Sequence, residues 1–254
     1  MSLEPEFEAW LRRQYPDDEA EWEGATEENI ARVEAIAGQP LPRFYRWFLS
    51  TLGGDPESLP EVPKVYRACS VDIVLGAYER GELARVGPPF LFIGEIEDPM
   101  LTMSFFYDLS RPIRDDAMVM THYTGMGMSE SSETLREWLA WASLLGTRVL
   151  KSPQHCSGRL ESPSGAVMAQ IEPVLATLGF VEVVPHGPFC GAYEREDAAL
   201  ALKVEPEAES DDLLIFVLGG PDAKTLRRLL GTLSTEGEIE VKISKWKPPL
   251  PTSA

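Results

Sequence analysis

The chain has 254 residues and a mass of 28.2 kDa, and 44% of its residues are hydrophobic, which is enough to bury one large core or two small ones. It carries 41 acidic residues against 23 basic ones, so its net charge at pH 7 is -18. Nucleic acids and anionic membranes are bound through cationic groups that displace counterions, so this composition argues against both as partners. A cationic partner, or none, is expected.

The first 54 residues show helical periodicity. Apolar spacing predicts a helix over Leu3–Gln14, followed by a second helix that is capped by Thr26 and ends at Gly38. A third helix is expected to begin at Pro42 and to end at the pair Gly53–Gly54. Residues 71–80 have the pattern of a further helix.

Beyond residue 80 the pattern changes to short apolar runs that are broken by Gly, Pro and Asp. Strands are predicted over 90–93, 101–107 and 118–121, and short turns between them favour an antiparallel sheet. Ser129–Ser132 is expected to cap a helix that covers the sheet and ends at Gly146.

The second half of the chain repeats this mixture of elements on a smaller scale. Two helices are predicted in this half, the first beginning at Ser162–Pro163 and the second at Gly219–Pro221. Strands are expected over 181–184, 192–195, 199–204, 213–218 and 238–244. The prediction is an α+β protein with helices packed on an antiparallel sheet, followed by a second, smaller α+β module. Its expected parts are a domain over 1–150, a linker over 151–162, a module over 163–246 and a flexible tail over 247–254.

Three features suggest where the protein resides. The first residues, Met1–Glu6, lack the cationic start and apolar stretch of a signal peptide, and no run of about 18 apolar residues is present. The three cysteines, Cys69, Cys156 and Cys190, are too few for a disulfide framework. We therefore expect a cytoplasmic protein.

One ordered series of residues resembles a known family. The series is Trp22-x-Gly24, Ile30-x-x-Val33-Glu34, Leu41-Pro42-x-x-Tyr45-x-x-Phe48-Leu49 and Gly53-Gly54. It resembles the SUKH superfamily, which includes yeast cell-wall regulators and bacterial toxin-immunity proteins. The resemblance covers about the first 146 residues, with Ser131–Leu145 in the place of the closing helix. The family usually has Trp directly followed by Gly, whereas Glu23 intervenes here.

The matched positions are typical of fold determinants rather than of catalytic groups. Pro42 begins a helix, Tyr45 and Phe48 fill a core, and the two glycines are expected to permit a turn with positive φ. The resemblance therefore implies a fold and a binding role, and no catalytic residue.

The acidic residues are concentrated near the N-terminus, because residues 1–34 hold 11 acidic and 3 basic residues. Two interpretations of the densest part remain open: a solvated connection before a helix, or a surface that binds a cationic protein with Trp22 as its anchor. A competing acidic surface is expected at the end of a strand. The candidate partner-binding residues are Asp17, Asp18, Glu19, Glu21, Trp22, Glu23, Glu95, Glu97 and Asp98.

Other chemistry is poorly supported by the sequence. His155–Cys156 and His186-x-x-x-Cys190 make a zinc site arithmetically possible, but their spacing is not that of paired zinc ligands. Asp115–Asp116 could hold a hard cation, although turn residues also explain the pair. No nucleophile motif or phosphate loop is present, so we expect no metal, no cofactor and no enzyme activity.

The resulting hypothesis is a non-enzymatic acidic binding protein, most simply an immunity protein that neutralises a cognate toxin by direct binding. The alternative is a cytoplasmic scaffold or regulatory adaptor in which the first module docks a cellular partner. The sequence leaves the identity of the partner and the oligomeric state open.

Overall fold

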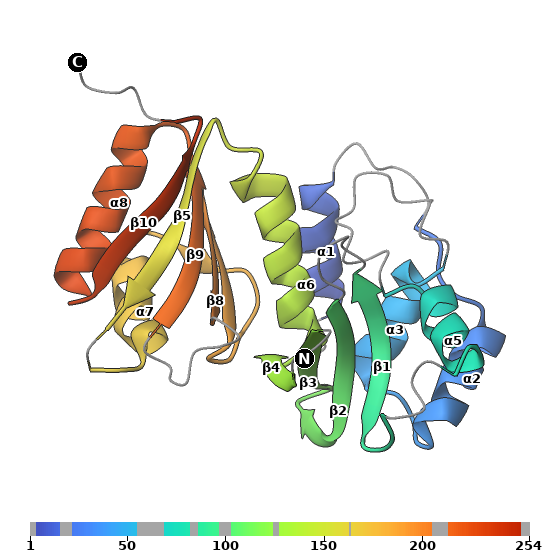
Figure 1. Cartoon of the computed structure of the whole chain (residues 1–254). Coiled ribbons are helices and arrows are strands. Elements are labelled where there is room, and N and C mark those ends of the chain that lie inside the picture. Colours follow the sequence, from blue (N-terminus) through green and yellow to red (C-terminus); the bar gives the residue numbers. More distant parts are fainter. Residues whose placement is uncertain are drawn as a thin grey trace. The chain divides into compact units, whose positions relative to one another are not determined.

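The computed structural model describes residues 4–15, 22–54, 69–81, 86–96, 103–123, 127–162, 164–204 and 213–249. These residues form seven α-helices and two antiparallel sheets, so the α+β class is confirmed (Figure 1). The chain divides into two compact units, unit 1 over Met1–Leu139 and unit 2 over Ala140–Ala254. The division falls within the helix that was expected to close the first domain, and not in a linker after it.

Unit 1 begins with the helices α1 (Glu4–Gln14), α2 (Glu27–Ala37), α3 (Arg43–Leu52) and α5 (Val71–Glu79). The predicted ends of α2 are confirmed, because the Thr26 hydroxyl accepts a hydrogen bond from the Asn29 amide at 3.3 Å, and Gly38 adopts the left-handed conformation with φ 68°. Pro42 directly precedes α3, where its missing N–H is no loss. Figure 1 shows α2, α3 and α5 grouped beside strand β1.

The sheet of unit 1 has four strands in the order β1-β2-β3-β4. They are β1 (Phe90–Ile96), β2 (Met103–Ile113), β3 (Asp116–Tyr123) and β4 (Met128–Ser132). The expectation that Ser129–Ser132 caps a helix is wrong, because this segment forms β4 and Ser129 pairs with Thr121 of β3. Helix α6 (Leu135–Leu144) begins later, after Thr134, whose hydroxyl accepts a hydrogen bond from the Glu137 amide at 3.2 Å.

Aromatic side chains fill the core of unit 1. Tyr45 of α3 meets Tyr107 of β2 edge to face, with 5.1 Å between ring centroids. On the same strand, Phe105 lies 4.2 Å from the ring of Trp138 in α6. Aromatic pairs of this kind add to the stabilisation that burial itself provides. The two contacts fix α3 and α6 on the sheet.

The predicted end of α6 at Gly146 is wrong, because the chain continues as a π-helix, η2, over Leu145–Val149. The Thr147 hydroxyl donates to the Ser143 carbonyl at 2.7 Å and satisfies an acceptor at the junction. A glycine ends a helix only when the backbone turns there into the left-handed region, and Gly146 is not among the positive-φ residues.

Unit 2 contains a six-stranded antiparallel sheet in the order β10-β5-β9-β8-β7-β6. Its strands are β5 (Gln154–Glu161), β6 (Val181–Glu182), β7 (Cys190–Arg195), β8 (Ala198–Val204), β9 (Leu213–Gly220) and β10 (Glu240–Lys247). The expected linker is therefore wrong, because most of 151–162 forms β5, an interior strand with β10 on one side and β9 on the other. The expected start of the tail at Lys247 is also wrong, since Lys247 belongs to β10. Residues 250–254 lie outside the described residues.

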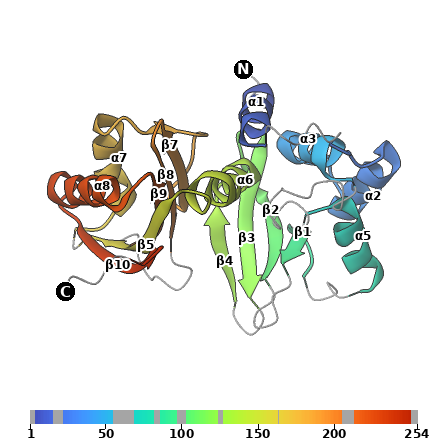
Figure 2. The same ribbon diagram turned by 90° about the horizontal axis from the view of Figure 1, so that it is seen from above.

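Two helices, α7 (Val167–Thr177) and α8 (Ala223–Glu236), cover one face of this sheet (Figure 2). Side chains of both helices share a buried core with inward-facing residues of the strands, among them Cys156, Leu160 and Phe216. The opposite face of the sheet carries the alternate residues of the same strands. No helix in the described part of the chain combines the length with the apolarity that crossing a bilayer requires.

Candidate functional site

The motif that carries the family resemblance forms one structural cluster in unit 1. The Gly54 amide donates to the Glu23 carbonyl at 2.9 Å, and the Ala25 amide donates to the Leu49 carbonyl at 2.8 Å. A Cβ atom on Gly24 would lie 1.9 Å from the Ser50 carbonyl oxygen. The segment 22–25 is thus held against the end of α3 by backbone contacts that leave no room for a side chain at Gly24.

This cluster corrects the expected role of the glycine pair. Gly53 has φ of −87°, and neither Gly53 nor Gly54 is among the residues with positive φ. A Cβ on Gly54 would lie 2.5 Å from the Glu23 carbonyl oxygen. Gly54 therefore permits a close approach of two backbones, and neither glycine makes a left-handed turn.

Trp22, the expected anchor of a partner surface, is half-buried. The guanidinium of Arg12 lies 4.0 Å from the centroid of its ring, and two nitrogens of Arg12 donate to Glu8 at 3.0 and 2.9 Å. The Nε1 atom of Trp22 is buried and has no hydrogen-bond partner among the described residues. One face of the ring is therefore covered by a cation of the chain itself.

Exposed carboxylates follow Trp22 directly, and we refer to Glu23, Glu27 and Glu28 as the acidic rim. Glu27 accepts from Arg46 at 2.5 Å, and the same guanidinium also bonds Glu34 at 2.9 Å. Glu23 and Glu28 have no ion-pair partner within the described ranges. Carboxylates at the start of α2 also favour its positive end, so the rim combines a helix-stabilising role with a negative surface.

Among the other predicted site residues, the structure describes only Glu95. Asp17, Asp18, Glu19 and Glu21 lie outside the described residues, as do Glu97 and Asp98. Glu95 is half-buried on β1, where it accepts a hydrogen bond from the Ser104 hydroxyl of β2 at 2.9 Å. It belongs to the sheet and is held there, whereas Glu23 lies beside α2 and α3.

A buried polar cluster was not predicted as a unit by the sequence. The Asp116 carboxylate accepts hydrogen bonds from the Tyr107 hydroxyl at 2.7 Å, from the Ala117 amide at 2.9 Å and from the Arg136 amide at 3.2 Å. Burial raises the pKa of Asp116 to about 6, although these hydrogen bonds oppose the shift. The cluster joins β2, β3 and the first turn of α6.

The neighbouring Asp115 completes this cluster. Its partial burial acts to raise its pKa, but the hydrogen bonds and charge of Arg136 outweigh burial and hold the pKa below its ordinary value. Arg136 bonds both oxygens of Asp115 at 3.1 and 3.2 Å, and its guanidinium lies 4.4 Å from the centroid of Phe44. The carboxylates that could have held a hard cation are thus engaged by the chain's own donors.

His186 lies beside a pocket of about 310 Å³ in unit 2, and its side chain is almost fully buried. Its Nδ1 atom is 2.8 Å from the Gly187 carbonyl, so Nδ1 carries the proton, and in the neutral ring Nε2 accepts from the Tyr193 hydroxyl at 2.5 Å. Burial, and after it the charge of Glu172, raises the pKa of Tyr193. Tyr193 therefore keeps its proton and donates it in this hydrogen bond.

The remaining candidates for metal or thiol chemistry are also separated. All three cysteines are buried and free. Burial raises the pKa of Cys156 to about 12, which opposes formation of a thiolate. Within the described ranges, no group of three His, Cys, Asp or Glu side chains is placed to hold a metal ion.

Comparisons with protein-family models, with curated proteins and with solved structures find no match to this chain.

Proposed function

We propose that unit 1 is a non-enzymatic binding module that captures a cationic protein through the acidic rim. The observation that carries this proposal is an imbalance of neighbouring charges. Arg12 and Arg46 are each held by carboxylates of the chain, while Glu23 and Glu28 are exposed and have no cationic partner among the described residues. A surface of this kind accelerates the approach of an oppositely charged partner.

The more specific proposal is that this module acts as an immunity protein, which neutralises a toxin by binding to it. The support is the resemblance to the SUKH superfamily together with the places of the matched residues. Tyr45, Phe48 and Leu49 are fully buried, and Gly24 and Gly54 lie at close backbone contacts.

A second candidate is a scaffold or regulatory adaptor. Unit 2 favours it, because this unit has a complete core of its own and could carry a separate task. The two candidates differ in what the partner does to a cell when the chain is absent.

The test begins with capture of the partner from extracts of the source cells on the immobilised chain, followed by kinetics with the purified partner. Reversal of charge in Glu23→Lys/Glu28→Lys is expected to slow association by about tenfold at low salt and to flatten its salt dependence. The matched control is Glu196→Lys/Glu236→Lys, which makes the same change of charge at exposed positions of unit 2. Equal association rates for the rim variant and the control would contradict a role for the rim.

Expression of the partner in host cells then separates the two functions. Growth arrest that is relieved by the chain, and not by the rim variant, is expected of an immunity protein. A partner that leaves growth unaffected would favour the adaptor.

A further inference from the structure

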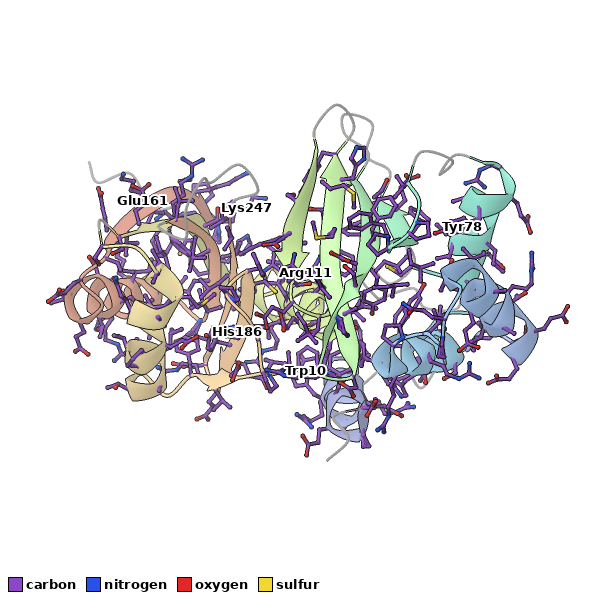
Figure 3. All side chains as sticks on the ribbon, turned by 90° about the horizontal axis from the view of Figure 1, so that it is seen from below. Trp10, Tyr78, Arg111, Glu161, His186 and Lys247 are labelled. Carbon is purple, nitrogen blue, oxygen red and sulfur yellow. The ribbon has the colours of Figure 1, made fainter. Side chains whose placement is uncertain are left out.

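A small basic pocket lies in unit 2, on the face of the sheet that α7 and α8 leave uncovered. Its volume is about 190 Å³. Its apolar part is made by Leu145, Leu150 and Val217. Its polar part is made by His155, Ser157, Lys245 and Lys247. Figure 3 shows Lys247 well separated from His186, so this pocket is distinct from the one beside the His186–Tyr193 pair.

Strand register explains why these polar groups converge. On β5, Cys156 and Leu160 face the helices, so His155 and Ser157 point to the opposite face. Lys247 pairs with His155, and Lys245 pairs with Ser157, which places each lysine beside its cross-strand neighbour.

The end of β10 is held in place by a further contact. The Gln154 side-chain amide donates to the Pro248 carbonyl at 2.8 Å and ties the chain after Lys247 to the start of β5. The basic groups are thus carried by paired strands and not by a loop. A site on rigid elements loses little entropy when a ligand binds.

The two lysines of the pocket differ from the next lysine on the strand. Lys242 is neutralised by Glu161 at 2.6 Å and by Glu240 at 3.3 Å. Lys245 and Lys247 have no carboxylate within ion-pair distance in the part of the chain that the structure describes. Two adjacent ammonium groups without a carboxylate partner among the described residues are unexpected on a chain with a net charge of -18.

His155 lines the pocket beside the two lysines. Its Nδ1 atom is buried and has no hydrogen-bond partner among the described residues. A buried atom offers no surface to a ligand, so the imidazole forms part of the wall, and the two ammonium groups are the groups suited to the oxygens of an anion.

The apolar wall selects the type of anion. Val217 of β9 is flanked by Leu145 and by Leu150, whose side chain is 50% exposed. A strongly hydrated ion such as inorganic phosphate would gain nothing from these side chains. The pocket is also smaller than the roughly 300 Å³ at which sites for drug-sized molecules begin.

We propose that this pocket binds a small carboxylate with a branched aliphatic tail. The carboxylate lies between Lys245 and Lys247, and the tail lies against Leu145 and Val217. A free organic acid and the C-terminal carboxylate of a peptide that ends in leucine share this chemistry. The inference concerns unit 2 alone and is independent of the function proposed for unit 1.

The test is isothermal titration calorimetry of the full chain with 4-methylpentanoate. Binding at one site is expected for the unaltered chain, and Lys245→Gln/Lys247→Gln is expected to weaken it by about tenfold, as the loss of charge-assisted contacts implies. The uncharged analogue 4-methylpentanamide should bind the unaltered chain more weakly than 4-methylpentanoate does, by a similar factor. The matched control Lys224→Gln removes an exposed lysine from α8, outside the pocket, and should bind as the unaltered chain does.

A second arm separates the two sources of the carboxylate. The peptide Gly-Gly-Leu is titrated with a free and with an amidated C-terminus. Tighter binding of the free peptide than of 4-methylpentanoate assigns the site to a protein C-terminus, and the reverse order assigns it to a small acid. Absence of binding by both carboxylate probes, 4-methylpentanoate and the free peptide, would overturn the proposal. Equal binding by the double variant, with its melting temperature unchanged, would also overturn it.

Discussion

Asp116 is an ionisable residue of unit 1 whose surroundings differ strongly from those of a surface carboxylate. It is 2% exposed and accepts three hydrogen bonds, of which two come from backbone amides. Its raised pKa shows that these bonds do not fully replace the hydration that burial removes. The residue therefore makes the stability of unit 1 depend on pH in an unusual direction.

The direction follows from the two protonation equilibria. The pKa of Asp116 is about 6 in the folded chain, against an ordinary 3.8, so between these values the folded state holds the proton more tightly. Stability contributed by this group increases as the pH falls from 7 toward 4. Asp115 acts in the opposite sense, because its lowered pKa gives stability that is present above its ordinary value and is lost as the pH falls below it.

Urea unfolding at pH 7 and pH 5 checks this prediction. Asp116 should make the free energy of unfolding about 1 kcal/mol higher at pH 5 than at pH 7, and Asp116→Asn should remove that difference. Each protein is compared with itself at two pH values, so the effect of altered hydrogen bonds on the free energy of unfolding cancels. If both proteins respond equally to pH, Asp116 does not titrate in this range.

Among the elements, the contact between segment 22–25 and the end of α3 makes a specific demand on one residue. Gly24→Ala should destabilise the chain by about 3 kcal/mol, because the added methyl group would meet the backbone at Ser50, which cannot move without disturbing α3. Gly87→Ala is the control, since a Cβ there meets nothing within 4 Å. Chemical denaturation measures the free energy of unfolding of both variants. Similar effects of the two substitutions would show that the backbone at Gly24 has more room than the contact implies.

The sequence predicts those elements whose ends depend on local chemistry. Thr26 and Gly38 bound α2 as expected, because capping involves residues within one turn. The prediction for Ser129–Ser132 is wrong because a serine pair suits a cap and a strand alike, and only its pairing with β3 decides between them. The sequence does not predict strand β5, for a similar reason. Its inward residues include Gly158, so little apolar alternation marks it as a strand.

The same division between local and distant interactions applies to the candidate site. The motif around Gly24 was recognisable because its residue types are unusual. The structural role of these residues could not be predicted, since Gly54 contacts the carbonyl of Glu23, which is distant in sequence. The Asp116–Arg136 cluster could not be predicted either, because each residue taken alone resembles a turn or surface residue.

At the scale of the whole molecule, each unit has its own sheet and core. The separate cores predict that each unit folds alone, provided that a fragment keeps α6 intact, because the division falls within this helix. Fragments 1–150 and 134–254 meet this condition.

Far-UV circular dichroism during denaturation checks both fragments. Each should unfold in a single cooperative transition, and a mixture of the two is the control for association between them. A fragment without a cooperative transition would show that its core is completed by the other part of the chain.

The position of β5 has a consequence for synthesis of the protein on the ribosome. Its outer neighbour is β10, and the paired residues of the two strands lie 79 to 92 positions apart, from Glu240 with Glu161 to Lys247 with His155. During translation, β5 leaves the ribosome long before β10. Until β10 is made, the backbone N–H and C=O groups on the β10 side of β5 have no partner strand. Such an unpaired edge is a site for association with other chains. Nascent chains that stall within α8 should therefore be the ones that most need a chaperone.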